Sequence, residues 1–236
     1  MRTLIGRAIV LERRDYKEAD LKVLLTTDRF GHLYAVAPNA KKSRRRFVGG
    51  FNTFSLLEIS ADKKGDMYIL NETTLIDENE TAFENLGSFI TASSLAEISE
   101  RLFTLNNPDE TAYYRLKFAL DHLTGRKDIF LIFNFLRSLM TDAGEIPEFR
   151  FCAMCQGEIV DKRVLFNYFK GGILCRECSS KDSRGENISH NLYKLMLADE
   201  QDAEGFDESL QRQGIFLLER YLRFKLGITF RSFCFL

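Results

Sequence analysis

Four cysteines in two CxxC pairs are the residues whose types and spacing point most directly to chemistry. The pairs are Cys152 with Cys155, and Cys175 with Cys178. Each spacing predicts a tight turn that aims both sulfurs at one point, so the four thiolates can converge tetrahedrally on one ion. Zinc prefers this ligand set, and the spacing falls in the zinc-ribbon range. We therefore expect a structural Zn²⁺ held by these four cysteines, in a module at about residues 150–180.

The stretch between the two pairs favours a β-hairpin. Residues 164–169 form a β-rich run, 170–172 contain a Gly-Gly turn, and 173–174 begin the return. A zinc site closed by four cysteines has no open position for substrate, so its ion would stabilise the module and could not activate water.

Other interpretations of the cysteines fit less well. Disulfides need an oxidising compartment, and the first residues contain no apolar signal stretch. A thioredoxin-like redox pair would explain one CxxC but not two. The fifth cysteine, Cys234, lies in an apolar tail, where we expect a small core residue and not a ligand.

A second candidate site is a basic run beside Phe47. Such clusters bind phosphates through charge and counterion release, without reading sequence. Residues 1–78 hold 14 Lys and Arg against 11 Asp and Glu, although the whole chain has a formal net charge of −1. The alternative interpretation is a solvated surface loop. The candidate DNA-binding residues are Lys41, Lys42, Arg44, Arg45 and Arg46.

The basic run lies within a segment that reads as strands and turns. Five short strands with no long helix suggest a small barrel, and the most economical choice is an OB-fold over residues 1–79. An SH3-like barrel is the alternative that strand counting cannot separate. OB-folds add aromatic platforms on which bases stack. The expected strands cover residues 4–11, 21–27, 32–37, 51–59 and 67–76.

From residue 80 the hydrophobic period changes from two to 3.6, which predicts a helical domain over 80–236. The capping-box pattern of Thr81 and Glu84 would start its first helix, and Asn107-Pro108-Asp109-Glu110 a second. Three further features follow in the chain: a third helix at about 127–142, a polar linker at 179–187, and helices after Ser189 that end at Gly227, before an apolar tail that packs back.

The expected fold class is therefore α+β, with an N-terminal five-stranded OB-fold barrel followed by an α-helical domain with an inserted zinc-ribbon-like module of four cysteines. No P-loop, GxGxxG, HExxH or GxSxG motif appears, and the histidines are isolated. No carboxylate cluster suggests a catalytic metal. The chain reads as a binding protein and not an enzyme. No apolar run approaches the roughly 18 residues that span a bilayer, so we expect no membrane contact and a cytoplasmic location.

Several stretches of the chain, taken in order, form a recognisable series: 8–11, 15–20, 24–31, 41–44, 51–58, 135–147 leading into the CxxC pairs, and 220–232. In this order they resemble the RecO family of bacterial DNA repair proteins, and the resemblance spans nearly the whole chain. One departure is that Pro38-Asn39 stands where the family commonly has Lys-Gly before its basic loop.

The resemblance implies a recombination mediator without enzymatic turnover. Such proteins bind single-stranded and double-stranded DNA and anneal complementary single strands. They act with the RecR protein to load recombinase onto strands covered by single-stranded DNA-binding protein. The alternative from another class is a zinc-stabilised protein–protein adaptor without direct DNA binding. Salt separates the two, because affinity for phosphates falls steeply with ionic strength and affinity for an apolar groove does not.

Overall fold

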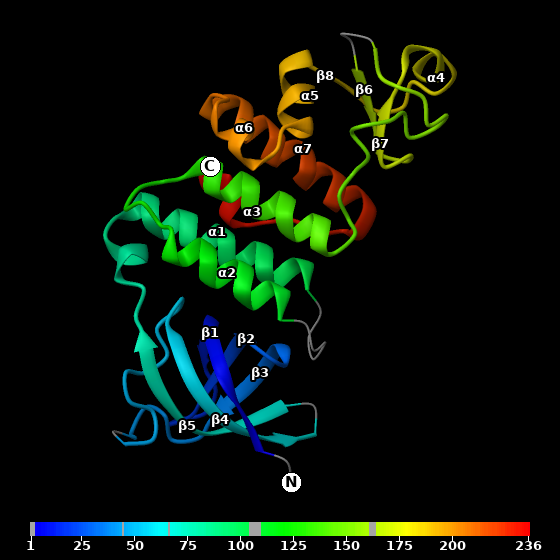
Figure 1. Ribbon diagram of the computed structural model, residues 1–236. Coiled ribbons are helices and arrows are strands. Elements are labelled where there is room, and N and C mark those ends of the chain that lie inside the picture. The colour runs from blue at the N-terminus through cyan, green and yellow to red at the C-terminus, as the bar shows by residue number, and fades with distance from the viewer. Residues whose placement is uncertain (1–2, 44, 66, 104–109, 161–163) are drawn as a thin grey trace. The chain divides into compact units, whose positions relative to one another are not determined.

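The computed structural model describes residues 3–43, 45–65, 67–103, 110–160 and 164–236 (Figure 1). It confirms the α+β class, with a closed five-stranded barrel followed by helices. By packing, the chain forms two compact units, residues 1–128 with Phe235 and residues 129–234 with Leu236. The domain boundary between residues 79 and 80 stays a prediction.

The barrel has the strand order β1-β2-β3-β5-β4 and closes where β4 pairs with β1. All of its pairs are antiparallel except β3 with β5, which is parallel. This Greek-key order is that of an OB-fold, so it decides between the two barrels that strand counting left open. The strands are β1 Thr3–Asp15, β2 Leu21–Thr27, β3 Gly31–Ala37, β4 Leu56–Lys64 and β5 Met67–Asp77.

Inward-facing and outward-facing residues alternate along the strands, and the small and branched side chains that face inward fill the barrel. Val23 and Leu25 of β2 face inward, as do Leu33 and Ala35 of β3, and all four are fully buried. The first strand is longer than expected, because a register shift between Val10 and Glu12 lets β1 continue beside β2 to Asp15.

The fourth strand begins at Leu56, so the expected start at residue 51 is wrong. Phe54 has a φ of 71°, which an extended strand excludes, and the Ser55 N–H donates to the Asn52 carbonyl at 3.1 Å. Residues 51–55 therefore form a turn. Phe51 and Phe54 are 1% exposed. The apolar side chains that suggested a strand are therefore buried core residues of a turn.

Two α-helices and a short 3-10 helix complete the first unit, and α1 and α2 pack on β1. The capping box at Thr81 and Glu84 is wrong. The helix cap is Asn85, whose side chain accepts from the Ser88 N–H at 3.0 Å. Of the expected second helix start at 107–110, residues 107–109 lie outside the described residues, and Glu110 directly precedes α2 without capping it through its side chain. The elements are η1 Glu80–Phe83, α1 Leu86–Leu102 and α2 Thr111–Asp121.

In the second unit, α7 packs against α3 and α5. Ser189 and Asp207 cap α5 and α7, because their side chains accept backbone N–H bonds of the first turns. Gly227, with a φ of 70°, ends α7 as expected. The elements are α3 Ile129–Asp142, β6 Val164–Asn167, β7 Gly172–Leu174, α4 Arg176–Lys181, β8 Glu186–Ile188, α5 His190–Leu197, α6 Glu200–Glu204, α7 Glu208–Leu226 and η2 Ser232–Phe235.

Two expectations about this unit are wrong. The polar stretch 179–187 is not a linker, because it completes α4 and then enters β8, which pairs with β6. Cys234 is exposed and not a core residue, and its thiol donates to the Arg231 carbonyl at 2.9 Å. The tail does bury Phe230 and Phe233. No helix in the described parts of the chain is both long and apolar enough to cross a membrane.

Replacing Gly214 with alanine should destabilise the protein, although the same change usually stabilises a helix by about 1 kcal/mol. A Cβ at this buried position would lie 2.6 Å from Cε2 of Phe133, on α3. We expect a loss of about 1–3 kcal/mol from this overpacking, measured by urea unfolding. The exposed neighbour Gln213 provides the control, Gln213→Ala. A Gly214→Ala variant as stable as the control would contradict the close α3–α7 contact.

Candidate functional site

The four cysteines of the CxxC pairs meet at one point. Their sulfur atoms all lie within 4.8 Å of one another, and the Sγ atoms of Cys155 and Cys175 are 3.8 Å apart. Sulfurs at about 2.3 Å from a tetrahedral zinc ion lie roughly 3.8 Å from each other. The sulfur arrangement therefore has the size that such a site requires.

The first cysteine turn is fixed by backbone hydrogen bonds. The Cys152 N–H donates to the Gly157 carbonyl at 2.9 Å, and the Gln156 N–H returns to the Cys152 carbonyl at 2.8 Å. Gln156 has a φ of 62°, which reverses the chain after Cys155. The turn is attached to β7 because the Ala153 N–H donates to the Ile173 carbonyl at 2.8 Å. These bonds hold the first sulfur pair beside the strand that leads to the second.

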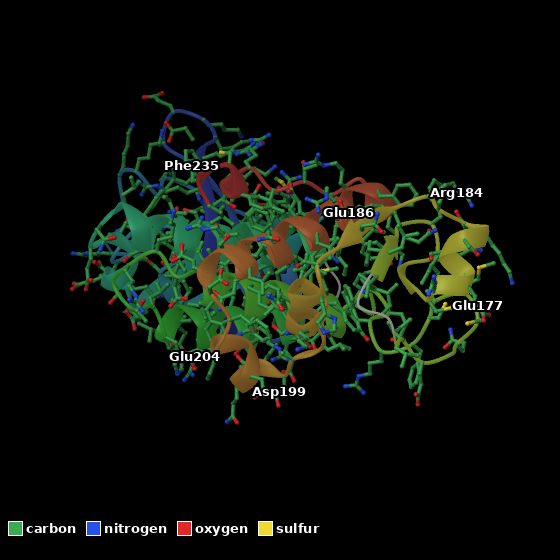
Figure 2. The ribbon with its side chains drawn as sticks, turned by 90° about the horizontal axis from the view of Figure 1, so that it is seen from above. Glu177, Arg184, Glu186, Asp199, Glu204 and Phe235 are labelled. Carbon is green, nitrogen blue, oxygen red and sulfur yellow. The ribbon has the colours of Figure 1, made fainter. Side chains whose placement is uncertain are left out.

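The second pair spans the junction of β7 and α4. Cys175 precedes the first residue of α4, and Cys178 lies in its first turn, next to Glu177, which is labelled in Figure 2. In the hairpin, Leu165 of β6 pairs with Leu174 of β7. These two leucines pack with Cys152 and Cys178 in a small apolar cluster. A cluster this small is typical of modules that depend on a metal for stability.

The protein environment shifts the pKa values of the two buried thiols in opposite directions. Burial opposes ionisation of Cys152, but N–H groups of Cys175, Cys155 and Met154 outweigh it and lower its pKa to about 6. Burial raises the pKa of Cys178 to about 12, and the neighbouring sulfurs add to the effect. Four adjacent thiolates repel one another, so a bound divalent cation would resolve this conflict. All five cysteines are free, and the four in the cluster can hold one metal ion, consistent with zinc.

The basic run lies on the connection between β3 and β4, against the β1–β2 turn. Lys41 pairs with Asp15 at 2.9 Å, and Lys42 with Glu18 at 3.6 Å. The backbone follows the same path, because the Lys41 N–H donates to the Ala19 carbonyl at 3.1 Å. Two of the expected DNA contacts therefore already have carboxylate partners. Arg44 lies outside the described residues.

The remaining two arginines, Arg45 and Arg46, directly precede the buried residue Phe47. Arg45 is exposed and makes no ion pair with the described residues. Arg46 donates through Nη2 to the Pro38 carbonyl at 2.7 Å, and its guanidinium lies 5.1 Å from the centre of the Phe47 ring. Phe47 is 4% exposed and belongs to the barrel core. The Thr73 N–H of β5 donates to the Arg46 carbonyl at 2.7 Å. The cations are thus presented on the outside of a rigid barrel.

Three aromatic residues near cations on the barrel were missed from the sequence. The Lys22 ammonium lies 4.4 Å from the Tyr34 ring centre, and Lys63 lies 5.9 Å from Tyr68. Tyr16, in the β1–β2 turn, has the next residue's ammonium 5.4 Å from its ring. Because Tyr16 and Lys17 are neighbours in the sequence, their pairing could have been predicted. The other two pairs depend on strand register. For example, Tyr34 lies opposite Leu24, two residues along β2 from Lys22.

Comparisons with known proteins match both parts of the chain. A model described as "Recombination protein O N terminal" matches residues 1–79, and one described as "Recombination protein O C terminal" matches residues 84–232. The chain belongs to the RecO family. The resemblance stated from the sequence is confirmed, and with it the assignment to DNA repair proteins.

RecO proteins from several bacteria are similar to most of the chain, and each is named "DNA repair protein RecO". That of Myxococcus xanthus is 30% identical over 173 residues, covering 72% of this chain and 70% of the relative. That of Thermoanaerobacter sp. is 29% identical over 186 residues, covering 77% and 73%. That of Desulfosudis oleivorans is 26% identical over 245 residues, covering 95% and 94%.

Replacing Cys175 with serine should remove the bound metal and lower the melting temperature, because three thiolates and a hydroxyl hold a soft-ligand ion poorly. Elemental analysis of purified protein and a thermal melt measure the two effects. Cys234→Ser is the matched control, since Cys234 is outside the cluster. Equal metal content and equal melting in the two variants would contradict the site.

Proposed function

We propose that this RecO-family protein is a DNA repair and homologous recombination mediator that works without enzymatic turnover. It binds DNA through the barrel, anneals complementary single strands, and acts with the RecR protein to load recombinase onto strands covered by single-stranded DNA-binding protein. The observation that carries the proposal is the exposed basic run on the barrel, anchored from below by the buried Phe47. Family membership supports it.

The ion pairs of Lys41 and Lys42 do not prevent phosphate binding. The lysine side chains are 33% and 68% exposed, and their partners Asp15 and Glu18 are 79% and 92% exposed. Exposed pairs of this kind contribute only about 0–1 kcal/mol. A strand that brings several phosphates and releases its counterions can replace the two carboxylates at small cost. The proposed contacts are Lys41, Lys42, Arg44, Arg45 and Arg46.

Aromatic rings on the proposed surface would contact the bases, in addition to the phosphate contacts of the basic residues. OB-folds bind oligonucleotides on the face of their second and third strands and on the loops after strands one and four. Tyr34 lies on β3, Tyr16 in the β1–β2 turn and Tyr68 just after the β4–β5 turn. Each ring has a lysine beside it. Stacking on such rings tolerates any base, which suits a protein that binds without reading sequence.

Annealing follows from charge neutralisation. Two complementary strands repel each other through their phosphates, and a basic surface that binds both lowers that repulsion while leaving the base edges free to pair. This chemistry requires no nucleophile, general base or open metal site. We therefore place no catalytic residue in the protein.

The Cys152, Cys155, Cys175 and Cys178 group is proposed as a structural Zn²⁺ site. A zinc ion with four thiolates is coordinatively closed, so when bound it supplies stability and no reaction centre. The residues of the chain position the sulfurs through the two turns and the β6–β7 hairpin. RecR and single-stranded DNA-binding protein are proposed as partners from the family, and the cytoplasm as the location.

Changing all five basic residues to alanine should abolish tight binding of a labelled single-stranded oligonucleotide. In a salt series, wild-type affinity should fall steeply with ionic strength. Five lost phosphate contacts would reduce the slope of log K against log salt by up to about 3.5. Fluorescence anisotropy measures both quantities.

A control variant should remove the same charge from other exposed positions. Its affinity should stay within about threefold of wild type if the barrel run is the site. Unchanged binding in the barrel variant would move the site elsewhere, and no binding by wild type at low salt would favour the adaptor. The control changes Arg101, Arg150, Arg176, Lys181 and Lys194 to alanine.

The wild-type protein should accelerate annealing of complementary oligonucleotides, and the five-alanine variant should lose the acceleration together with DNA affinity. A fluorescence-quenching assay with dyes on the two strands follows the rate. Adding ATP should change nothing, because no nucleotide-binding motif is present. Rapid annealing by a variant that no longer binds DNA would show that the basic run is not responsible.

A further inference from the structure

A second surface of the first compact unit is acidic and apolar, whereas the basic run is cationic. Four large apolar side chains at the end of β5, in η1 and at the start of α1 are exposed, and carboxylates surround them. We call this the acidic aromatic surface. Its apolar members are Ile76, Phe83, Leu86 and Phe89, and its acidic members are Asp77, Glu78, Glu80 and Glu84.

Two of the apolar members, Phe83 and Phe89, form a contiguous cluster with Phe54. The Phe83 and Phe89 ring centres are 6.1 Å apart, and both rings contact Phe54, at 5.6 and 6.0 Å. Phe54 is 1% exposed, whereas Phe83 is 49% and Leu86 is 73% exposed. Phe54 therefore forms a buried base, and the outer faces of the other side chains remain in water. Exposed apolar clusters rimmed by polar residues are typical of protein interaction sites.

The carboxylates make the surface predominantly acidic, and Arg13 reaches only its edge, where it donates to the Asn52 side chain at 3.4 Å. Among the described residues, Asp77, Glu78, Glu80 and Glu84 make no ion pair. Two hollows lie along them. One of ≈ 570 Å³ is lined by residues 75–81 with Leu120 and Asp121. The other, of ≈ 240 Å³, is lined by Phe83 with Glu78, Glu80, Glu84 and Asn52. A negative field in a hollow attracts cationic side chains and repels DNA and anionic lipid.

The backbone of this surface is held in place before any partner arrives. The Asn79 side chain donates to the Phe54 carbonyl at 2.7 Å, and the Asp77 carboxylate accepts from the Asn79 N–H at 2.8 Å. Asn85 caps α1 directly before Leu86. A surface fixed in this way loses little conformational entropy on binding.

We propose that the acidic aromatic surface docks an amphipathic helix of a partner protein, with apolar side chains on Phe83, Leu86 and Phe89 and flanking Lys or Arg in the acidic hollows. A helix is favoured over a strand because the neighbouring sheet is a closed barrel, which offers no edge for strand addition. Charge complementarity selects a basic helix. The inference goes beyond DNA binding and stands whether or not the basic run binds DNA.

The test uses the full chain and a fluorescein-labelled helical peptide with leucines at i, i+4 and i+7, flanked by lysines. A second peptide carries glutamates in place of the lysines. We expect saturable binding of the lysine peptide that weakens with salt, and no binding of the glutamate peptide. The Glu78→Gln, Glu80→Gln, Glu84→Gln variant should bind about tenfold more weakly, since it removes three exposed carboxylates that would pair with the peptide lysines.

Two further variants separate charge from apolar contact. Phe83→Ser with Leu86→Ser should abolish peptide binding while retaining the DNA affinity and circular dichroism of wild type. A matched variant with Glu58, Glu72 and Glu204 changed to glutamine should bind the peptide as wild type does, because these exposed carboxylates lie outside the surface.

Three results would overturn the proposal: no saturable binding at low salt, equal binding of the two peptides, or unchanged affinity in the serine variant. Sedimentation velocity of the unliganded protein adds a fourth. If wild type self-associates and the serine variant does not, the surface belongs to a second copy of the chain and not to a basic helix.

Discussion

The burial of Phe47 and Phe51 in the closed barrel is the constraint on which the proposed DNA surface depends. The two rings, 5.5 Å apart, tie the long β3–β4 connection to a core that the five strands seal around them. The ring of Phe47 points inward, while the described cations that precede it, Lys41, Lys42, Arg45 and Arg46, are exposed. The Arg46 carbonyl bond to β5 fixes the same segment from its backbone. The barrel thus orders a run of like charges that would extend and repel in a free loop.

A different constraint acts at the four-cysteine module of the second compact unit. Beside the sulfurs the apolar cluster is small, with Leu165 and Leu174 packed against Cys152 and Cys178, although Val164, Phe166 and Ile173 of the same hairpin are also buried. Burial opposes ionisation of both thiols, but N–H groups lower the pKa of Cys152, while the neighbouring sulfurs raise the pKa of Cys178 further, so the sulfur cluster favours a cation. The barrel is therefore stabilised by a sheet closed on itself, and the cysteine module would gain stability from a bound metal ion.

The sequence predicted the features that depend on local pattern. The CxxC spacings located the cysteine cluster, strand alternation located the barrel, and Gly227 located the end of α7. It failed where tertiary contacts decide. Phe51 and Phe54 looked like strand residues, but the left-handed backbone at Phe54 places both in a turn, where their side chains are buried. Residues 186–188, which follow a polar stretch, gave no sign of pairing with β6. The carboxylate partners of Lys41 and Lys42, and the meeting of Lys22 with Tyr34, require the strand register that only the fold supplies.

The central claim is that DNA lies along the barrel over the basic run. Hydrogen–deuterium exchange of the full protein with and without a single-stranded oligonucleotide tests it without altering any residue. The account predicts slower exchange on binding in residues 38–50 and in the β1–β2 turn at 16–20, since both segments would be covered together. Protection confined to the cysteine module or to α5–α7, with residues 38–50 unchanged, would contradict it.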